Sequence, residues 1–295
     1  MPTVPPSPAT FALLVVAVLA VSSSGPLAAA SVVAPFAIAF WRNGLATAVL
    51  LPVTAVHRRA ELRALDRRTI GWCVVAGVLL AAHFATWIPS LQLTSVATAT
   101  ALVCTTPVWT ALLTRAPRAT WAGIAVAVAG VVLLTGVDLS VSSRALGGDA
   151  LALAGGAFAA GYVLAGERVR RTASTTVYTA LCYAVCAALL LGLCLTTGTP
   201  LGGYDAASWA GLVALMVGPQ LLGHSIFNQV LDRIPATVVS LIILFEVPGA
   251  AVLAWAFLGQ APPMLAWAGI ALLLAGLAIV VIGNRRPSVE AEPVG

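Results

Sequence analysis

Long runs of apolar residues, separated by short polar stretches, take up most of the sequence. Each run approaches the roughly 20 residues that an α-helix needs to cross the hydrocarbon core of a bilayer. Such a run is expected to be helical, because a helix satisfies its backbone polar groups within one apolar segment. The pattern predicts an all-α integral membrane protein with ten transmembrane helices, near residues 11–30, 33–56, 71–91, 94–114, 119–137, 148–166, 176–197, 207–230, 234–258 and 265–283.

The composition excludes a soluble globular protein. Of the 295 residues, 60% are hydrophobic and 8% are charged, whereas an average soluble domain has roughly 25% charged residues. Ten crossings use roughly 200 residues, so only short loops and tails remain and there is no room for a soluble catalytic domain. The five cysteines fall inside apolar runs without the spacing of zinc ligands. We interpret them as packing residues, and we expect neither a metal nor a cofactor.

The basic residues, all of them arginine, lie mostly on one side of the predicted bundle. Short loops rich in arginine stay on the cytoplasmic side, so we expect both termini in the cytoplasm and the helices in the inner (cytoplasmic) membrane. Because the arginines form small scattered groups, we expect the lipid bilayer and not nucleic acid as the large partner. The arginines of the predicted cytoplasmic side are Arg58, Arg59, Arg63, Arg67, Arg68, Arg115, Arg118, Arg168, Arg170, Arg171, Arg233, Arg285 and Arg286, against Arg144 on the opposite side.

Two sequence matches indicate an internal duplication. Residues 121–130 read WAGIAVAVAG and residues 267–276 read WAGIALLLAG, a displacement of 146 residues. A second match, displaced by 141 residues, places His83 over His224 and Pro107 over Pro248. Each half then has five crossings, an odd number, so the two repeats have opposite orientations in the membrane. Inverted repeats of this kind support alternating access to a site near the middle of the membrane.

The duplication also predicts how the chain is divided, and the repeated motif contains glycines at a spacing that suits close helix packing. The expected units are a first repeat at residues 1–137, a linker at 138–147, a second repeat at 148–284 and a cytoplasmic tail at 285–295. Within the repeated motif, Gly123 with Gly130, and Gly269 with Gly276, place small residues on one helix face. This spacing is typical of helices that pack closely in a membrane.

Several stretches, taken together in their order and spacing, resemble a known family. They are Phe40-Trp-Arg-Asn-Gly-Leu-Ala, His83-Phe-Ala-Thr-Trp, Thr105-Thr-Pro-Val-Trp, Gly155-Gly-Ala-Phe-Ala-Ala-Gly-Tyr, Gly223-His-Ser-Ile-Phe-Asn and Leu244-Phe-Glu-Val-Pro-Gly. Over nearly its whole length the chain resembles the EamA type of the drug/metabolite transporter superfamily. The resemblance implies ten helices in two five-helix repeats and transport of small metabolites, often outward. One departure is that the glutamate-proline pair frequent in the ninth helix is spread to Glu246-Val-Pro.

Few strongly polar residues lie inside the predicted spans. Such residues are costly in a bilayer and usually face the bundle interior or a watery cavity. His83 and Trp87 are four residues apart and share a helix face, and Gln220, His224 and Asn228 form a stripe on the eighth helix. The repeat match places these faces opposite each other, so we expect both to line one cavity. The expected substrate-binding residues are Arg42, His83, Trp87, Gln220, His224 and Asn228.

Some of these residues have more than one reasonable role. Each histidine can instead hydrogen-bond a neighbouring helix and do nothing else. Arg42 can pair with Glu246, stay structural, or bind a substrate carboxylate through two parallel hydrogen bonds. Glu246 is the acidic residue that lies well inside a span, so it is the candidate for ion coupling by taking up and releasing a proton.

The expected function is secondary transport of a small polar metabolite, an amino acid or a related compound, outward by alternating access. The sequence has no nucleotide-binding G-x-x-x-x-G-K-S/T loop, so the energy would come from the substrate gradient or from an ion. We expect no enzyme, because the spans contain neither G-x-S-x-G nor an aspartate pair. An intramembrane enzyme and a channel or scaffold subunit are the alternatives. Proton coupling and a homodimer stay open.

Overall fold

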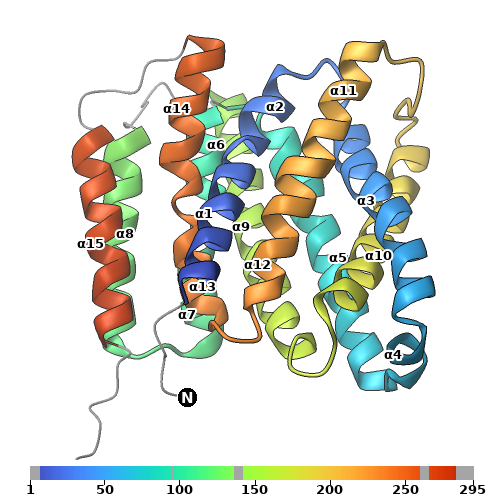
Figure 1. Ribbon diagram of the computed structural model, residues 1–295. Coiled ribbons are helices and arrows are strands. Elements are labelled where there is room, and N and C mark those ends of the chain that lie inside the picture. The colour runs from blue at the N-terminus through green and yellow to red at the C-terminus, as the bar shows by residue number, and fades with distance from the viewer. Residues whose placement is uncertain (1–6, 95, 136–141, 260–265, 284–295) are drawn as a thin grey trace, which may run out of the picture.

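The computed structural model describes residues 7–94, 96–135, 142–259 and 266–283, and the regular structure of these residues is helical throughout (Figure 1). Among them, seven helical stretches are long and apolar enough to cross a bilayer. Two shorter apolar helices lie at Thr98–Thr114 and Thr120–Gly130. The chain is therefore an all-α, multi-pass membrane protein, as its sequence predicts. Seven stretches rather than ten satisfy the criterion of length and apolarity.

Helices occupy each apolar run of the first half of the sequence. The run at 11–30 contains two helices, and the run at 94–114 is also divided in two. A short helix that the apolar pattern does not predict lies in the arginine-rich loop between the second and third runs. The bounds are α1 (Pro8–Ser22), α2 (Ser24–Ala30), α3 (Pro35–His57), α4 (Arg59–Ala64), α5 (Arg67–Ser90), α6 (Val96–Val103), α7 (Thr106–Thr114) and α8 (Arg118–Thr135).

The second half of the sequence is helical in the same way. Its first helix, α9, extends beyond the predicted run at both ends. A π-helix, η1, interrupts the run at 207–230. The bounds are α9 (Ser143–Val169), α10 (Thr175–Thr196), α11 (Ala206–Leu215), η1 (Met216–His224), α12 (Ser225–Val230), α13 (Ala236–Ile243), α14 (Glu246–Leu258) and α15 (Ala266–Gly283).

Two helices are broken at corresponding positions of the repeat. The break between α6 and α7 is followed by Pro107, and the break between α13 and α14 is followed by Pro248. Proline has no backbone N–H and is tolerated in the first turn of a helix, where that group would have no partner in the helix. The same displacement that aligns the prolines places Thr105 over Glu246. Glu246 thus lies at the start of a helix in the interior of the protein.

Side-chain caps explain where two of the helices begin. The Asp66 carboxylate accepts the backbone N–H of Thr69 at 2.8 Å before α5, and the Asp205 carboxylate accepts that of Ser208 at 2.8 Å before α11. Hydrogen bonds from the side chains and backbones of Thr69 and Ser208 lower the pKa of these two carboxyl groups. Both caps are therefore ionised at neutral pH, the form that accepts hydrogen bonds from a helix N-terminus.

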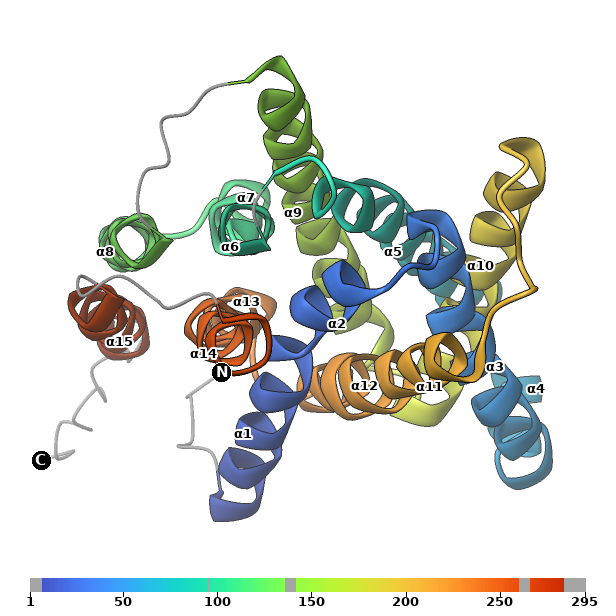
Figure 2. The same ribbon diagram turned by 90° about the horizontal axis from the view of Figure 1, so that it is seen from above.

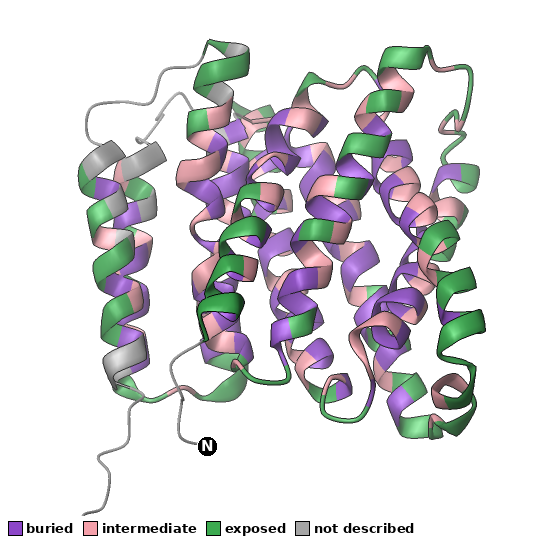
Figure 3. Cartoon of the chain, viewed as in Figure 1, coloured by how far each residue is buried: buried purple, intermediate pink, exposed green. Residues whose placement is uncertain are grey.

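The helices of the two halves pack against one another. Contacts join α5 to α9 and α10, α3 to α10, and α1 to η1 and α14. Seen from above, α8 and α15 lie side by side at one edge (Figure 2). Burial is concentrated on the sides of the helices that face the bundle (Figure 3). Large apolar side chains such as Phe11, Leu19 and Phe257 are 63%, 64% and 78% exposed, as expected where lipid covers the outer surface.

Glycines join α8 and α15, as the repeated motif predicts. A Cβ atom on Gly123 would lie 2.6 Å from the carbonyl oxygen of Gly276, and a Cβ atom on Gly276 would lie 2.6 Å from the backbone nitrogen of Ala127. A side-chain Cβ atom does not lie so close to a backbone atom to which it is not bonded. Glycine is therefore needed in α8 where α15 crosses it, and in α15 where α8 crosses it. The pair joins a helix of the first half of the chain to a helix of the second half.

We expect Gly276→Ala to lower the melting temperature of the purified protein, because overpacking at a tight contact costs roughly 1–3 kcal/mol. Gly192→Ala in α10 is the matched control, since a Cβ atom there meets nothing within 4 Å. Replacing a helical glycine by alanine at an open position stabilises by about 0.5–1 kcal/mol. The two variants should therefore shift the melting temperature in opposite directions. A shift of the same sign in both would contradict the close packing.

Candidate functional site

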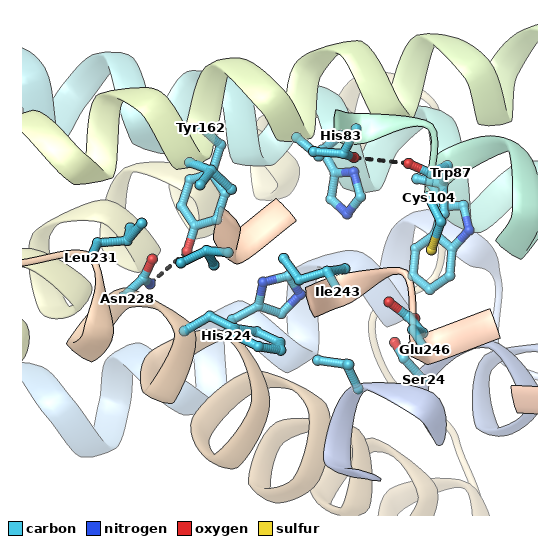
Figure 4. A pocket seen from close by; sticks show the side chains of 17 residues that line it. Ser24, His83, Trp87, Cys104, Tyr162, His224, Asn228, Leu231, Ile243 and Glu246 are labelled. Atoms are coloured by element: carbon cyan, nitrogen blue, oxygen red, sulfur yellow. Dashed lines mark hydrogen bonds between the residues drawn. The ribbon is translucent and has the colours of Figure 1, made fainter. Parts of the chain in front are cut away.

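A cavity lies between helices of the two sequence halves (Figure 4). Its volume is about 50 Å³, room for a few water molecules. The first half contributes side chains from the α1–α2 segment, α5 and the break between α6 and α7. The second half contributes α9, η1, α12, α13 and the start of α14. The lining residues are Val21, Ser24, His83, Trp87, Val103, Cys104, Thr106, Ala159, Tyr162, Val163, His224, Phe227, Asn228, Leu231, Val239, Ile243 and Glu246.

The two histidines aligned by the repeat meet in this cavity. Their ring centroids are 6.4 Å apart. Nδ1 of His83 lies 3.0 Å from the carbonyl oxygen of Gly155 on α9. Because a carbonyl oxygen only accepts hydrogen bonds, Nδ1 carries the hydrogen, and in a neutral ring Nε2 keeps its lone pair. His83 therefore hydrogen-bonds the neighbouring helix α9, as the purely structural alternative predicts. Its Nε2 atom can still accept a hydrogen bond from a ligand.

Aromatic rings surround the histidines. Trp87 stacks on His83 with centroids 5.7 Å apart and planes 13° apart, as expected from their spacing on α5. Tyr162 approaches His224 with centroids 6.1 Å apart, and its hydroxyl accepts a hydrogen bond of 2.6 Å from the Asn228 amide. Sequence reasoning did not select Tyr162. The available signal was a phenol inside an apolar span, since a buried hydroxyl needs a partner.

Arg42 and Gln220, two of the expected cavity residues, lie outside the lining. Both side chains are fully buried, with 0% exposure. Nε of Arg42 donates to Oε1 of Gln220 at 2.9 Å, and Nε2 of Gln220 donates to Oδ1 of Asn43 at 3.1 Å. The guanidinium carbon also lies 4.2 Å above the ring of Phe84. Gln220 thus joins η1 to α3, while His224 and Asn228 reach the cavity.

Part of the predicted polar stripe lies on the π-helix η1. Gln220 and His224 both belong to η1, which contains Pro219. Proline cannot donate to the preceding turn and its ring clashes with the backbone there. The wider π turn, with hydrogen bonds from residue i+5 to residue i, accommodates this but changes the angle between successive side chains. Four residues are close to one turn of either helix, so it is the hydrogen bonds of Gln220 with Arg42 and Asn43 that hold its side chain away from the cavity.

Glu246 lies at the other end of the cavity from Asn228, next to Ser24 (Figure 4). Its side chain is 8% exposed. The structure records no ion pair between Glu246 and Arg42, both of which are described. Nη1 of Arg42 instead donates to Oγ of Ser24 at 3.0 Å. Ser24 and Cys104, which also lines this end, are further residues that sequence reasoning did not select.

Comparison with known proteins agrees with this architecture. A solved crystal structure is 21% identical in sequence; the match covers 94% of this chain and 98% of that chain, with a TM-score of 0.72. At this level of identity the likeness shows the fold alone. A search of curated protein sequences finds no match. The model of the EamA-like transporter family matches residues 8–136 and, a second time, residues 146–282. On these matches, the chain belongs to the EamA-like transporter family.

Proposed function

We propose that this protein is a secondary transporter that exports a small polar metabolite, an amino acid or a related compound, by alternating access. The observation that carries the proposal is the cavity shared by the two halves, to which each half contributes one histidine. Inverted-repeat transporters bind their substrates near the middle of the membrane, at the interface of the repeats. The cavity residues His83, Trp87, His224 and Asn228 then contact the substrate.

The irregular backbone around the cavity supports the same proposal. The α6–α7 and α13–α14 breaks and the π-helix η1 all contribute residues to the lining. At membrane depth, broken helices are tolerated where they are buried in protein or line a cavity, and in transporters they often form the binding site. Glu246, at one of these breaks, is the proposed proton carrier. Arg42 holds the cavity wall through Gln220 and Ser24 rather than binding a substrate carboxylate.

Counterflow in proteoliposomes tests the proposal. Vesicles are loaded in turn with each unlabelled standard amino acid, and uptake of the same labelled compound is measured at equal pH on both sides. A carrier accumulates label transiently and saturably, because it exchanges one molecule for another. A channel shows no such overshoot, and an enzyme changes the compound chemically. Vesicles containing the purified protein that show no overshoot with any of these compounds would argue against the proposed substrate class.

We also propose that both termini lie in the cytoplasm, and expect a cysteine-accessibility map to show it. Single cysteines in residues 57–70 and 167–175 and in the tail after Gly283 should react with an impermeant reagent only in inside-out vesicles. The reason is the excess of arginine in the loops on this side, which the positive-inside rule places in the cytoplasm. A cysteine at Arg144, on the opposite side, is the control and should react in intact cells. A tail that is labelled in intact cells would exclude the proposed orientation.

A further inference from the structure

Three consecutive serines lie where α1 passes into α2, and the third has different partners from the other two. Oγ of Ser22 donates to the carbonyl oxygen of Val18 at 2.7 Å, and Oγ of Ser23 donates to that of Ala20 at 2.7 Å. Oγ of Ser24 instead accepts the hydrogen bond from Nη1 of Arg42. A hydroxyl has one hydrogen and two acceptor sites. Within the described residues no acceptor is recorded for the hydrogen of Ser24, so it remains available.

The hydroxyl of Ser24 lies beside Glu246. Both residues line the same end of the cavity, and Figure 4 shows them next to each other. The first turn of α14 packs directly on the serine segment, since a Cβ atom on Gly249 would collide with the side chain of Ser22. Glu246 and Gly249 are three residues apart and therefore on one face of α14. This face holds the carboxyl group of Glu246 near the serines.

Arg42 brings a buried positive charge to the same place. Its side chain is fully buried, and Nη2 has no hydrogen-bond partner. Removing a charge from water is costly unless an opposite charge or hydrogen bonds compensate for it. Glu246 is the acidic residue among those that line the cavity, and its neighbour Ser24 accepts a hydrogen bond from Arg42. The hydroxyl of Ser24 thus contacts the guanidinium of Arg42 and neighbours the carboxyl group of Glu246.

We propose that Ser24 is a positioning residue that connects Arg42 to Glu246 when Glu246 releases its proton. The proton passes from the carboxyl group to water in the cavity, and the Ser24 hydroxyl then donates its hydrogen to the carboxylate. Arg42 continues to donate to Ser24, so a chain of hydrogen bonds runs from Gln220 through Arg42 and Ser24 to Glu246. Proton release is thereby favoured without direct contact between the two charged groups. The inference rests on the proposed role of Glu246 in ion coupling.

The other polar groups around Glu246 are less suited to this role. The Nδ1 hydrogen of His83 is bound to Gly155, and the amide of Asn228 donates to Tyr162. His224 and Cys104 also line the cavity. Among the described residues that line the cavity, Trp87 is a competitor, since its buried indole N–H has no recorded hydrogen-bond partner. The test therefore includes Trp87.

The experiment follows the protonated carboxyl group of Glu246 directly, by infrared titration of the protein in lipid nanodiscs. The band of Glu246 is identified as the one that Glu246→Gln removes. In Ser24→Ala the midpoint of its titration should rise by about one pH unit, a tenfold tighter hold on the proton, because a hydrogen bond to the charged form is lost. Ser24→Thr keeps a hydroxyl and should restore the midpoint. Ser23→Ala is the matched control and should leave it unchanged.

The outcomes separate this inference from the proposed function. An unchanged midpoint in Ser24→Ala, or a band that does not titrate, overturns the role of Ser24 whether or not the protein transports. A shift produced by Trp87→Phe and not by Ser24→Ala assigns the role to the indole and also overturns the role of Ser24.

Ser24→Cys keeps the size of the side chain with a weaker donor and should shift the midpoint in the same direction as Ser24→Ala by a smaller amount. It is the test variant if Ser24→Ala does not fold. Failure of counterflow in the parent protein, with the titration as expected, would count against transport alone.

Discussion

Replacing Glu246 by glutamine should abolish uptake driven by an imposed pH gradient while preserving substrate counterflow. Glutamine has nearly the same shape as glutamate but cannot take up or release a proton. Proton-driven uptake of the substrate requires Glu246 to take up and release a proton in each cycle. In counterflow at equal pH the binding site changes sides in both directions with substrate bound, so no net movement of protons is needed. Both activities are measured in the same batch of proteoliposomes, with a compound that gives counterflow in the parent protein.

Glu167→Gln is the control for this substitution. Glu167 lies near the end of α9, outside the cavity lining, where it pairs with Arg171 at 3.4 Å. We expect its gradient-driven uptake and counterflow to match those of the parent protein. A full response of Glu246→Gln to the pH gradient would show that Glu246 is not the coupling residue. Loss of counterflow together with folding would instead make Glu246 a structural partner of Arg42, and Arg42→Met combined with Glu246→Leu should then restore stability.

The histidine pair should be required for counterflow, and two substitutions can separate this role from packing. His83→Asn keeps a donor near the position of Nδ1 for the carbonyl of Gly155 and removes the Nε2 acceptor. His224→Phe keeps a ring against Phe84 and Tyr162 and removes both nitrogens. Each lost hydrogen bond to a polar substrate is worth roughly 0.5–1.5 kcal/mol. We therefore expect the initial rate of counterflow to fall by about tenfold in each variant, since 1.36 kcal/mol is a factor of ten in rate.

His57→Ala is the control for the histidine variants, because His57 is exposed at the end of α3. Its counterflow and melting temperature should equal those of the parent protein. If His83→Asn and His224→Phe fold and transport at the parent rate, the histidines only hold neighbouring helices together. Transport lost in proportion to a lower melting temperature would support the same structural reading.

The sequence by itself predicted that the apolar runs are helical and that the two histidines meet, but it did not predict α4, the π-helix η1 or the breaks within the runs. Helix limits follow from local chemistry: a span must be apolar over about 20 residues, and charged or capping residues such as Asp66 and Arg67 mark its end. The meeting of His83 with His224 followed from the repeat match, because a duplication places the two residues at equivalent positions of the two halves. The glycine spacing of the repeated motif predicted close helix packing, while the approach of Gly123 to Gly276 is seen only in the structure.

Only the tertiary structure decided which polar side chains face the cavity. Helical periodicity gives Gln220 the same face as His224, but Gln220 is bound to Arg42 and Asn43 and lies outside the cavity lining. Tyr162 and Ser24 became visible as site residues only through their partners Asn228 and Arg42, which are 66 and 18 residues away in the chain. A hydroxyl or phenol in an apolar run indicates that a partner is needed, but not which residue the partner is. Its role depends on which donor or acceptor the packing of other helices places beside it, and that is a property of the folded protein.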